Sequence, residues 1–98
     1  MSLYVIIGHD IPNSSAARQA NRPAHLARLT ALDQQGRLVI AGPTPVTHGD
    51  TAITGSVVIA EFDDDAAVQA LASDEPYLLN GVYSHVDIKP FIKVFPNS

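Results

Sequence analysis

Histidine is the side chain in this sequence best suited to acid–base chemistry, because its ring gains and loses a proton close to neutral pH. His25 is the most informative of the four histidines. It lies four residues before Leu29 and seven before Leu32, and this spacing puts all three side chains on one face of a predicted helix. The pattern directs the imidazole toward the buried side, where it would act as a general acid or base or simply pack as a structural histidine.

Two adjacent carboxylates, Asp74 and Glu75, are the candidate partners of His25. They follow a second predicted helix, and a carboxylate in contact with the ring would fix its tautomer as the second member of an acid–base pair. Spacing alone does not bring this loop to the first helix. The alternative is a solvated pair of charges in front of Pro76.

The other histidines give little sign of a metal site. His9, His48 and His85 are scattered along the chain, without HxH or HExxH spacing. The absence of cysteine excludes a thiolate zinc site, an iron–sulfur cluster and a cysteine nucleophile. The acidic run Asp63-Asp64-Asp65 is expected to cap a helix, since carboxylates stabilise a helix N-terminus. We expect no metal and no organic cofactor.

Composition restricts the class of protein. The chain has 98 residues, of which 46% are apolar, and this composition indicates one folded domain over residues 1–98. Six Lys and Arg against ten Asp and Glu give a formal charge of −4, which argues against a nucleic-acid partner. The apolar runs are too short for a membrane span, and the N-terminus lacks the pattern of a signal peptide. We expect a cytoplasmic protein without membrane contact.

Hydrophobic periodicity and turn residues predict the order β-α-β-β-α-β. The predicted strands are 3–8, 37–41, 53–62 and 83–89, and the predicted helices are 21–35 and 63–73. Residues 14–20 are expected to form a short helical turn. Asn21 and Pro23 are taken as the start of the first helix, so His25 is expected in its first turn, where the helix dipole favours a neutral ring. The favoured solution is a ferredoxin-like α+β fold, with a four-stranded antiparallel sheet, two helices on one face, and the first and third strands central.

The two central strands predict a homodimer. Residues 3–7 and 57–60 are apolar on both faces, whereas a sheet with one wet face alternates apolar and polar residues. Helices cover only one face. The same face of a second copy is the simplest cover for the other.

Motifs along nearly the whole chain resemble the YciI-like (YCII-related) family. The first is Arg22-Pro23-Ala24-His25-Leu26-Ala27-Arg28-Leu29. The others are Gly36-Arg37-Leu38, Ala41-Gly42-Pro43, Thr54-Gly55-Ser56, Gly81-Val82-Tyr83 and the ending VDIKPFIKVF over residues 86–95. The resemblance implies a ferredoxin-like fold paired into a dimeric α/β barrel.

The resemblance also implies a His–carboxylate cleft in each subunit. The family histidine corresponds to His25, and the family Asp stands directly before Pro, where this chain has Glu75 with Asp74 one residue earlier. One relative in aromatic degradation is a dehydrochlorinase, so we expect isomerisation or elimination on a small cyclic or aromatic metabolite. The alternative is a dimer that binds a metabolite without catalysis. Four residues are candidate walls of the substrate site: Tyr4, Pro43, Ser56 and Tyr77.

Overall fold

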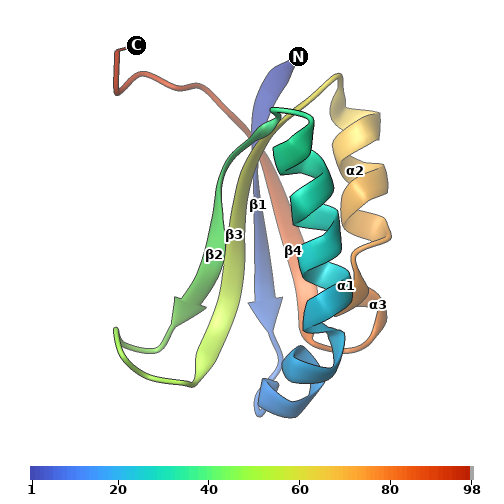
Figure 1. Cartoon of the computed structure of the whole chain (residues 1–98), viewed down its shortest axis with the longest axis vertical. Helices are drawn as coiled ribbons and strands as arrows, with labels where there is room; N and C mark the ends of the chain where they lie inside the picture. Colours follow the sequence, from blue (N-terminus) through green and yellow to red (C-terminus); the bar gives the residue numbers. More distant parts are fainter. Residues whose placement is uncertain (98) are drawn as a thin grey trace.

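A four-stranded antiparallel sheet with helices on one face forms the protein (Figure 1). The computed structural model describes residues 1–97. Its elements are β1 (Ser2–Asp10), α1 (Ser15–Gln34), β2 (Leu38–Pro45), β3 (Ile53–Phe62), α2 (Asp65–Ser73), α3 (Pro76–Leu79) and β4 (Tyr83–Phe91). The strand order is β2-β3-β1-β4. This arrangement confirms the ferredoxin-like α+β fold and the central position of the first and third strands.

The first helix begins earlier than predicted. Helix α1 starts at Ser15 and continues through Pro23, so the prediction of a start at Asn21 is wrong. A proline inside a helix costs about 3 kcal/mol because it removes one backbone hydrogen bond. Tertiary contacts of the first turns offset this cost: Ala17 packs against a buried cluster around Tyr77, and Arg18 pairs with Asp10.

Both edge strands extend through prolines that were expected to end them. Strand β2 continues to Pro45 and β4 to Phe91, past Pro90. Proline lacks the N–H that an inner strand would need, but an edge strand can turn that position toward solvent. The position of β2 and β4 at the two edges therefore explains why these segments remain paired.

The predicted helix ends agree well with the structure. Gly36 has a φ of 70°, in the left-handed region that favours glycine, directly after the C-cap Gln35. The carboxylate of Asp64 caps α2 and accepts a hydrogen bond from the backbone N–H of Ala67 at 2.8 Å. The acidic run thus has the structural role expected of it.

The core lies between the sheet and the helices. Buried side chains of β1 and β3, among them Tyr4, Val58 and Phe62, meet Leu32 of α1 and Val68 of α2. On α1 the inward face carries His25, Leu29 and Leu32, whereas Leu26, also expected inward, is 39% exposed. Successive residues of a helix are 100° apart around its axis. Side chains spaced by three residues therefore move gradually away from the buried face, and a spacing of four brings the next side chain back to it.

The opposite face of the sheet carries no helix (Figure 1). In the pairing of β1 with β3, Val5 lies opposite Ile59 and Ile7 opposite Val57, and these side chains are only partly buried. After β4 the chain continues as an arm that leaves the body, with Ile92, Val94 and Phe95 at least 65% exposed. Within residues 1–97, no helix is both long and apolar enough to cross a membrane.

Candidate active site

A cavity lies between the helices and the buried face of the sheet. Its polar wall includes His25 and Arg28 from α1, Ser56 from β3, Tyr83 from β4, and Glu75 between α2 and α3. Apolar side chains of β1, α1 and α2 complete it. The cavity volume is about 30 Å³, well below the ~300 Å³ of a small ligand site. A ring-sized ligand therefore requires wall side chains to move.

His25 and Glu75 are in direct contact across this wall. The Nδ1 atom of His25 forms a short hydrogen bond with Oε1 of Glu75. Both side chains are largely buried, with 9% and 14% of their surface exposed. A carboxylate accepts, so Nδ1 carries a hydrogen, and in the neutral ring the Nε2 lone pair remains available. Within residues 1–97, no side chain is hydrogen-bonded to Nε2.

The environment of His25 differs from the expected one in one respect. Because α1 begins at Ser15, His25 lies in the third turn and not in the first. The argument from the helix dipole is therefore wrong, since that effect fades beyond the first turn. What holds the ring tautomer is the carboxylate of Glu75, not the start of the helix.

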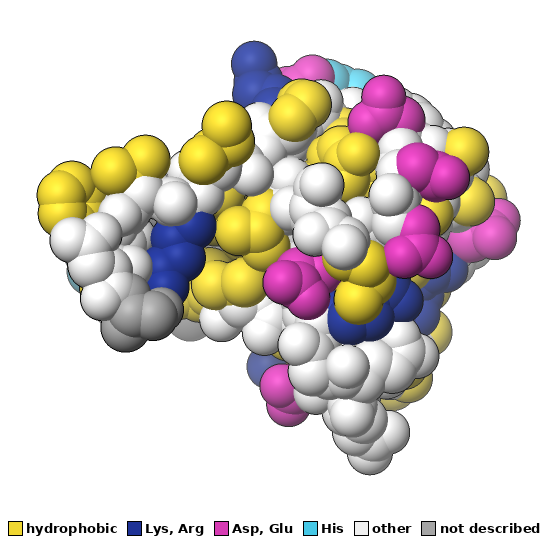
Figure 2. All heavy atoms as spheres, turned by 90° about the horizontal axis from the view of Figure 1, so that it is seen from above, with side chains coloured by type: hydrophobic (Ala, Val, Ile, Leu, Met, Phe, Trp, Pro, Cys, Tyr) yellow, Lys and Arg dark blue, Asp and Glu magenta, His cyan; other side chains and the backbone are white. Residues whose placement is uncertain are grey.

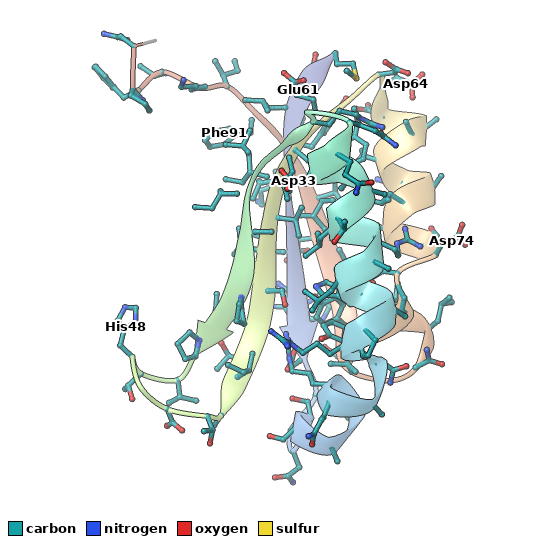
Figure 3. The ribbon with its side chains drawn as sticks, in the orientation of Figure 1. Asp33, His48, Glu61, Asp64, Asp74 and Phe91 are labelled. Atoms are coloured by element: carbon teal, nitrogen blue, oxygen red, sulfur yellow. The ribbon has the colours of Figure 1, made fainter. Side chains whose placement is uncertain are left out.

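The two candidate carboxylates occupy different positions. Glu75 is the N-cap of α3, and its Oε2 accepts a hydrogen bond from the backbone N–H of Tyr77 at 3.4 Å. Asp74 is the C-cap of α2, and its exposed side chain points away from the molecule (Figure 3). The structure therefore brings Glu75 to His25 and leaves Asp74 outside the contact.

Tyr77 supports the imidazole ring from behind. The two rings are stacked, with centroids 4.1 Å apart and planes inclined by 14°. Tyr77 itself is 1% exposed and meets the ring of Tyr83 edge-on at 5.4 Å. Such contacts contribute about 1 kcal/mol each beyond area burial, and they fix the plane of His25.

A buried ion pair lies next to this aromatic cluster. Arg18 donates two hydrogen bonds to Asp10, at 2.6 and 3.0 Å, and a third to the Ser56 hydroxyl at 2.7 Å. Its guanidinium also lies over the Tyr77 ring, 4.8 Å from the centroid. Burial opposes the charge, but the hydrogen bond and the attraction of Asp10 outweigh it and raise the pKa of Arg18. A buried cation, paired with Asp10, therefore lies beside the cavity.

Tyr83 brings a neutral phenol to the same cavity. Burial raises the pKa of Tyr83 to about 12, although a hydrogen bond with Ser56 acts in the opposite direction. The ring fits because Gly8 has no side chain: a Cβ there would lie 2.3 Å from the ring carbon Cζ. Near neutral pH, Tyr83 therefore offers an O–H that can donate to an oxygen of a ligand.

Arg28 links the two main helices beside the cavity. It donates to the backbone carbonyls of Leu71 and Asp74, at 2.5 and 2.6 Å. Both acceptors lie at the end of α2, where helix carbonyls lack helical partners. The Arg28 side chain therefore forms a part of the cavity wall that can move without breaking hydrogen bonds of the sheet.

Only some of the four predicted wall residues lie at the cavity. Ser56 lines the cavity, and Tyr77 lies directly behind His25. Tyr4 does not reach the cavity, because it packs edge-on against Phe62 and donates to Asp65 at 2.7 Å. Pro43 lies exposed on β2, outside the cavity wall. Tyr4 and Pro43 therefore do not line this cavity, whereas Ser56 does.

Sequence reasoning missed Asp10, Arg18, Arg28 and Tyr83 as members of the site. Asp10 and Arg18 lie on different elements, and Tyr83 enters through strand pairing, so no local spacing marks them. A usable signal was present at Gly8, since an isolated glycine in an apolar strand indicates close approach by another group.

Comparison with known proteins agrees with this architecture. The family described as YCII-related domain matches residues 2–92. Protein YciI of Escherichia coli O6:H1 is 50% identical over 97 residues, which is 95% of this chain and 99% of that protein. An uncharacterized protein of Haemophilus influenzae is 45% identical over 96 residues, 94% of this chain and 98% of that protein.

A solved structure with an assigned activity is also similar. It is the 5-chloro-2-hydroxyhydroquinone dehydrochlorinase of Burkholderia phenoliruptrix AC1100, in complex with 2,5-dihydroxybenzoquinone. The TM-score is 0.81 at 28% identity, over 92% of this chain and 93% of that chain. Because the family match covers nearly all described residues and two relatives share almost half of their residues or more, the chain belongs to the YCII-related family.

Proposed function

We propose that this protein is a small-molecule enzyme in which His25 is the general acid or base and Glu75 orients it. The observation that carries the proposal is the contact between Nδ1 of His25 and Glu75 at the wall of the cavity. It leaves Nε2 as the ring atom that exchanges a proton with a ligand. No metal or organic cofactor is part of the proposal.

The proposed chemistry is a proton transfer on a small cyclic or aromatic compound. In an elimination, Nε2 takes a proton from the substrate, the electrons of the broken bond form a new double bond, and chloride leaves with its bonding pair. In an isomerisation, the same nitrogen returns the proton to another atom. The Tyr83 hydroxyl supplies a hydrogen-bond donor at the cavity wall, which suits an oxygen that gains negative charge.

The substrate class rests on the similar dehydrochlorinase. That enzyme acts on a chlorinated hydroxyhydroquinone and binds a dihydroxybenzoquinone. The apolar walls, together with the hydroxyls of Ser56 and Tyr83, fit a flat ring with several oxygens. We therefore propose an oxygenated ring compound as the ligand, admitted when Arg28 moves away from the end of α2.

We also propose that two copies pair through the uncovered face of the sheet and form a dimeric α/β barrel over the whole chain. Apolar residues of β1 and β3 occupy the middle of that face, and Ile40 of β2 is 62% exposed beside them. Figure 2 shows hydrophobic side chains along the projecting arm and in the hollow beside it. A second copy has the matching apolar face, and its burial would cover both surfaces.

A chloride-release assay with 5-chloro-2-hydroxyhydroquinone tests the enzyme proposal. We expect turnover by the unmodified protein and a loss of about 10²–10⁴-fold in His25→Gln, the range typical of general acid–base catalysis. Glu75→Gln keeps the size of the side chain but loses its charge, and a smaller loss is expected. Asp74→Asn is the matched control, because its carboxylate lies outside the contact.

The outcomes distinguish the two candidate roles. If the ring compound binds but His25→Gln turns over as fast as the unmodified protein, His25 is not the catalytic group. If it binds and no turnover occurs across a panel of oxygenated and halogenated rings, the protein is a metabolite-binding dimer. Equal losses in Asp74→Asn and Glu75→Gln would contradict the assignment of Glu75.

A further inference from the structure

A cluster of three metal-ligating side chains lies on the uncovered face of the sheet, away from the cavity. His9 of β1 pairs across the ladder with His85 of β4, and Asp87 lies two residues further along β4. Successive side chains of a strand alternate between faces, so all three project from the same face. This group was not expected from sequence, because only the strand register places His9 opposite His85.

The geometry of the three side chains is already close to that of a chelate. Their ligand atoms all lie within 4.8 Å of one another, and Nε2 of His9 is 2.8 Å from Oδ2 of Asp87. The two imidazoles are stacked, with centroids 4.3 Å apart. Ligand atoms around one tetrahedral zinc ion are about 3.4 Å apart, so the distances fit, and the two stacked rings turn about their side-chain torsions to direct both lone pairs at one ion.

Ser84 sets His85 in the tautomer that a metal needs. Its hydroxyl donates to the backbone carbonyl of His9 at 3.2 Å, and the same oxygen is 2.8 Å from Nδ1 of His85. Since the single hydroxyl hydrogen is used on the carbonyl, Nδ1 of His85 is the donor in the second contact. Nε2 of His85 then keeps its lone pair, the arrangement typical of a histidine ligand with an outer hydrogen bond.

We propose that His9, His85 and Asp87 bind one divalent transition-metal ion, for which Zn²⁺ is the probe. Two imidazole nitrogens and one carboxylate oxygen form a common zinc ligand set, with the fourth position open to water. The ion replaces the proton that Nε2 of His9 shares with Asp87, and the ring then carries its hydrogen on Nδ1. In a single chain, the side chains of His9 and Asp87 are 40% and 51% exposed.

The site is independent of the proposed catalysis. The three ligands lie at the end of the sheet face where β1 ends and β4 begins, whereas Phe91 and the apolar arm lie at the opposite end (Figure 3). His25 and Glu75 occupy the other side of the sheet. A metal here links β1 to β4 and stabilises the folded state by mass action.

Calorimetric titration of the full chain with Zn²⁺ at pH 7.5, after treatment with a chelator, tests the proposal. We expect one ion per chain and a dissociation constant at least tenfold weaker in each of His9→Gln, His85→Gln and Asp87→Asn. His48→Gln is the control, because His48 lies in the loop between β2 and β3, apart from the cluster (Figure 3). Circular dichroism checks that each exposed substitution leaves the fold intact.

Two results would overturn the metal site. One is the absence of saturable Zn²⁺ binding by the unmodified protein up to millimolar concentration. The other is binding that the three variants leave unchanged, or that is lost in His25→Gln, which would place the ion at the cavity instead.

Discussion

The imidazole of His25 lies almost parallel to the phenol ring of Tyr77, with 4.1 Å between the ring centroids. The guanidinium of Arg18 lies over the same phenol ring, and the backbone N–H of Tyr77 donates to Glu75. One buried aromatic residue therefore touches three polar groups of the site. It positions the histidine plane while the carboxylate fixes the ring tautomer.

Removal of this ring should destabilise the fold. Tyr77→Ala leaves a cavity in a fully buried cluster and is expected to lower the free energy of unfolding by about 3–5 kcal/mol. Tyr77→Phe keeps the stacked ring and should stay within about 1 kcal/mol of the unmodified protein. Urea denaturation measures both, and equal losses in the two variants would show that the hydroxyl, not the ring, is what matters.

The pair formed by Asp10 and Arg18 predicts a large effect of a single substitution. Only 1% of the Asp10 side chain and 12% of the Arg18 side chain are exposed, so Asp10→Ala leaves a buried cation without its partner. The expected loss is about 3–5 kcal/mol in the free energy of unfolding. The double variant Asp10→Ala with Arg18→Met should recover part of it, since no charge then remains buried.

Asp33→Ala is the control for that experiment, because Asp33 is exposed on α1. Its effect should stay within about 0.5 kcal/mol. A cost below about 1 kcal/mol for Asp10→Ala would mean that the pair is not important for stability.

Tyr83 predicts a loss of stability at alkaline pH. Its folded pKa of about 12 lies above the ordinary value of 10.0, so the unfolded chain loses its proton first as the pH rises. The contribution of Tyr83 to the free energy of unfolding is fully present below pH 10 and is lost between pH 10 and 12. Its size is about 2 kcal/mol. Unfolding of the unmodified protein and of Tyr83→Phe, measured at several pH values, should differ in slope only in this window. If the free energy of unfolding of the two proteins changed in parallel between pH 10 and 12, the raised pKa of Tyr83 would be contradicted.

The uncovered sheet face predicts a dimer that one charge can disrupt. Ile59→Glu places a carboxylate among the apolar residues of β1, β2 and β3, where burial against a second copy would be costly. Sedimentation velocity should show the mass of two chains for the unmodified protein and of one chain for the variant. Ala70→Glu, at an exposed position of α2, is the matched control and should remain dimeric.

A monomeric unmodified protein at micromolar concentration would refute the dimer.

Most of the fold could be predicted from sequence because its signals are local. The predicted bounds of β3 agree with the structure, and Gly36 and Asp64 mark helix ends through their own backbone conformation and side-chain cap. The start of α1 could not be predicted, since Pro23 carries a strong local signal for a helix start. Only the tertiary contacts of Ala17 and Arg18 explain why the helix begins earlier.

The candidate site could be predicted only in part, because most of its contacts join elements that are distant in the sequence. His25 could be placed on a buried face from its spacing to Leu29 and Leu32 alone. The approach of Glu75, the pairing of Asp10 with Arg18, and the entry of Tyr83 over Gly8 depend on how distant elements pack. Tyr4 lies on the buried face, as strand alternation predicts, but alternation does not give its distance from the cavity.

The central claim is that Nε2 of His25 faces the ligand, and a crystal structure with bound 2,5-dihydroxybenzoquinone tests it most directly. The account predicts the ring in the cavity with Arg28 displaced and one ligand oxygen or carbon within about 3.5 Å of Nε2. A ligand bound elsewhere, or a ring that leaves His25 shielded by Glu75 and Tyr77 and out of reach, would contradict it.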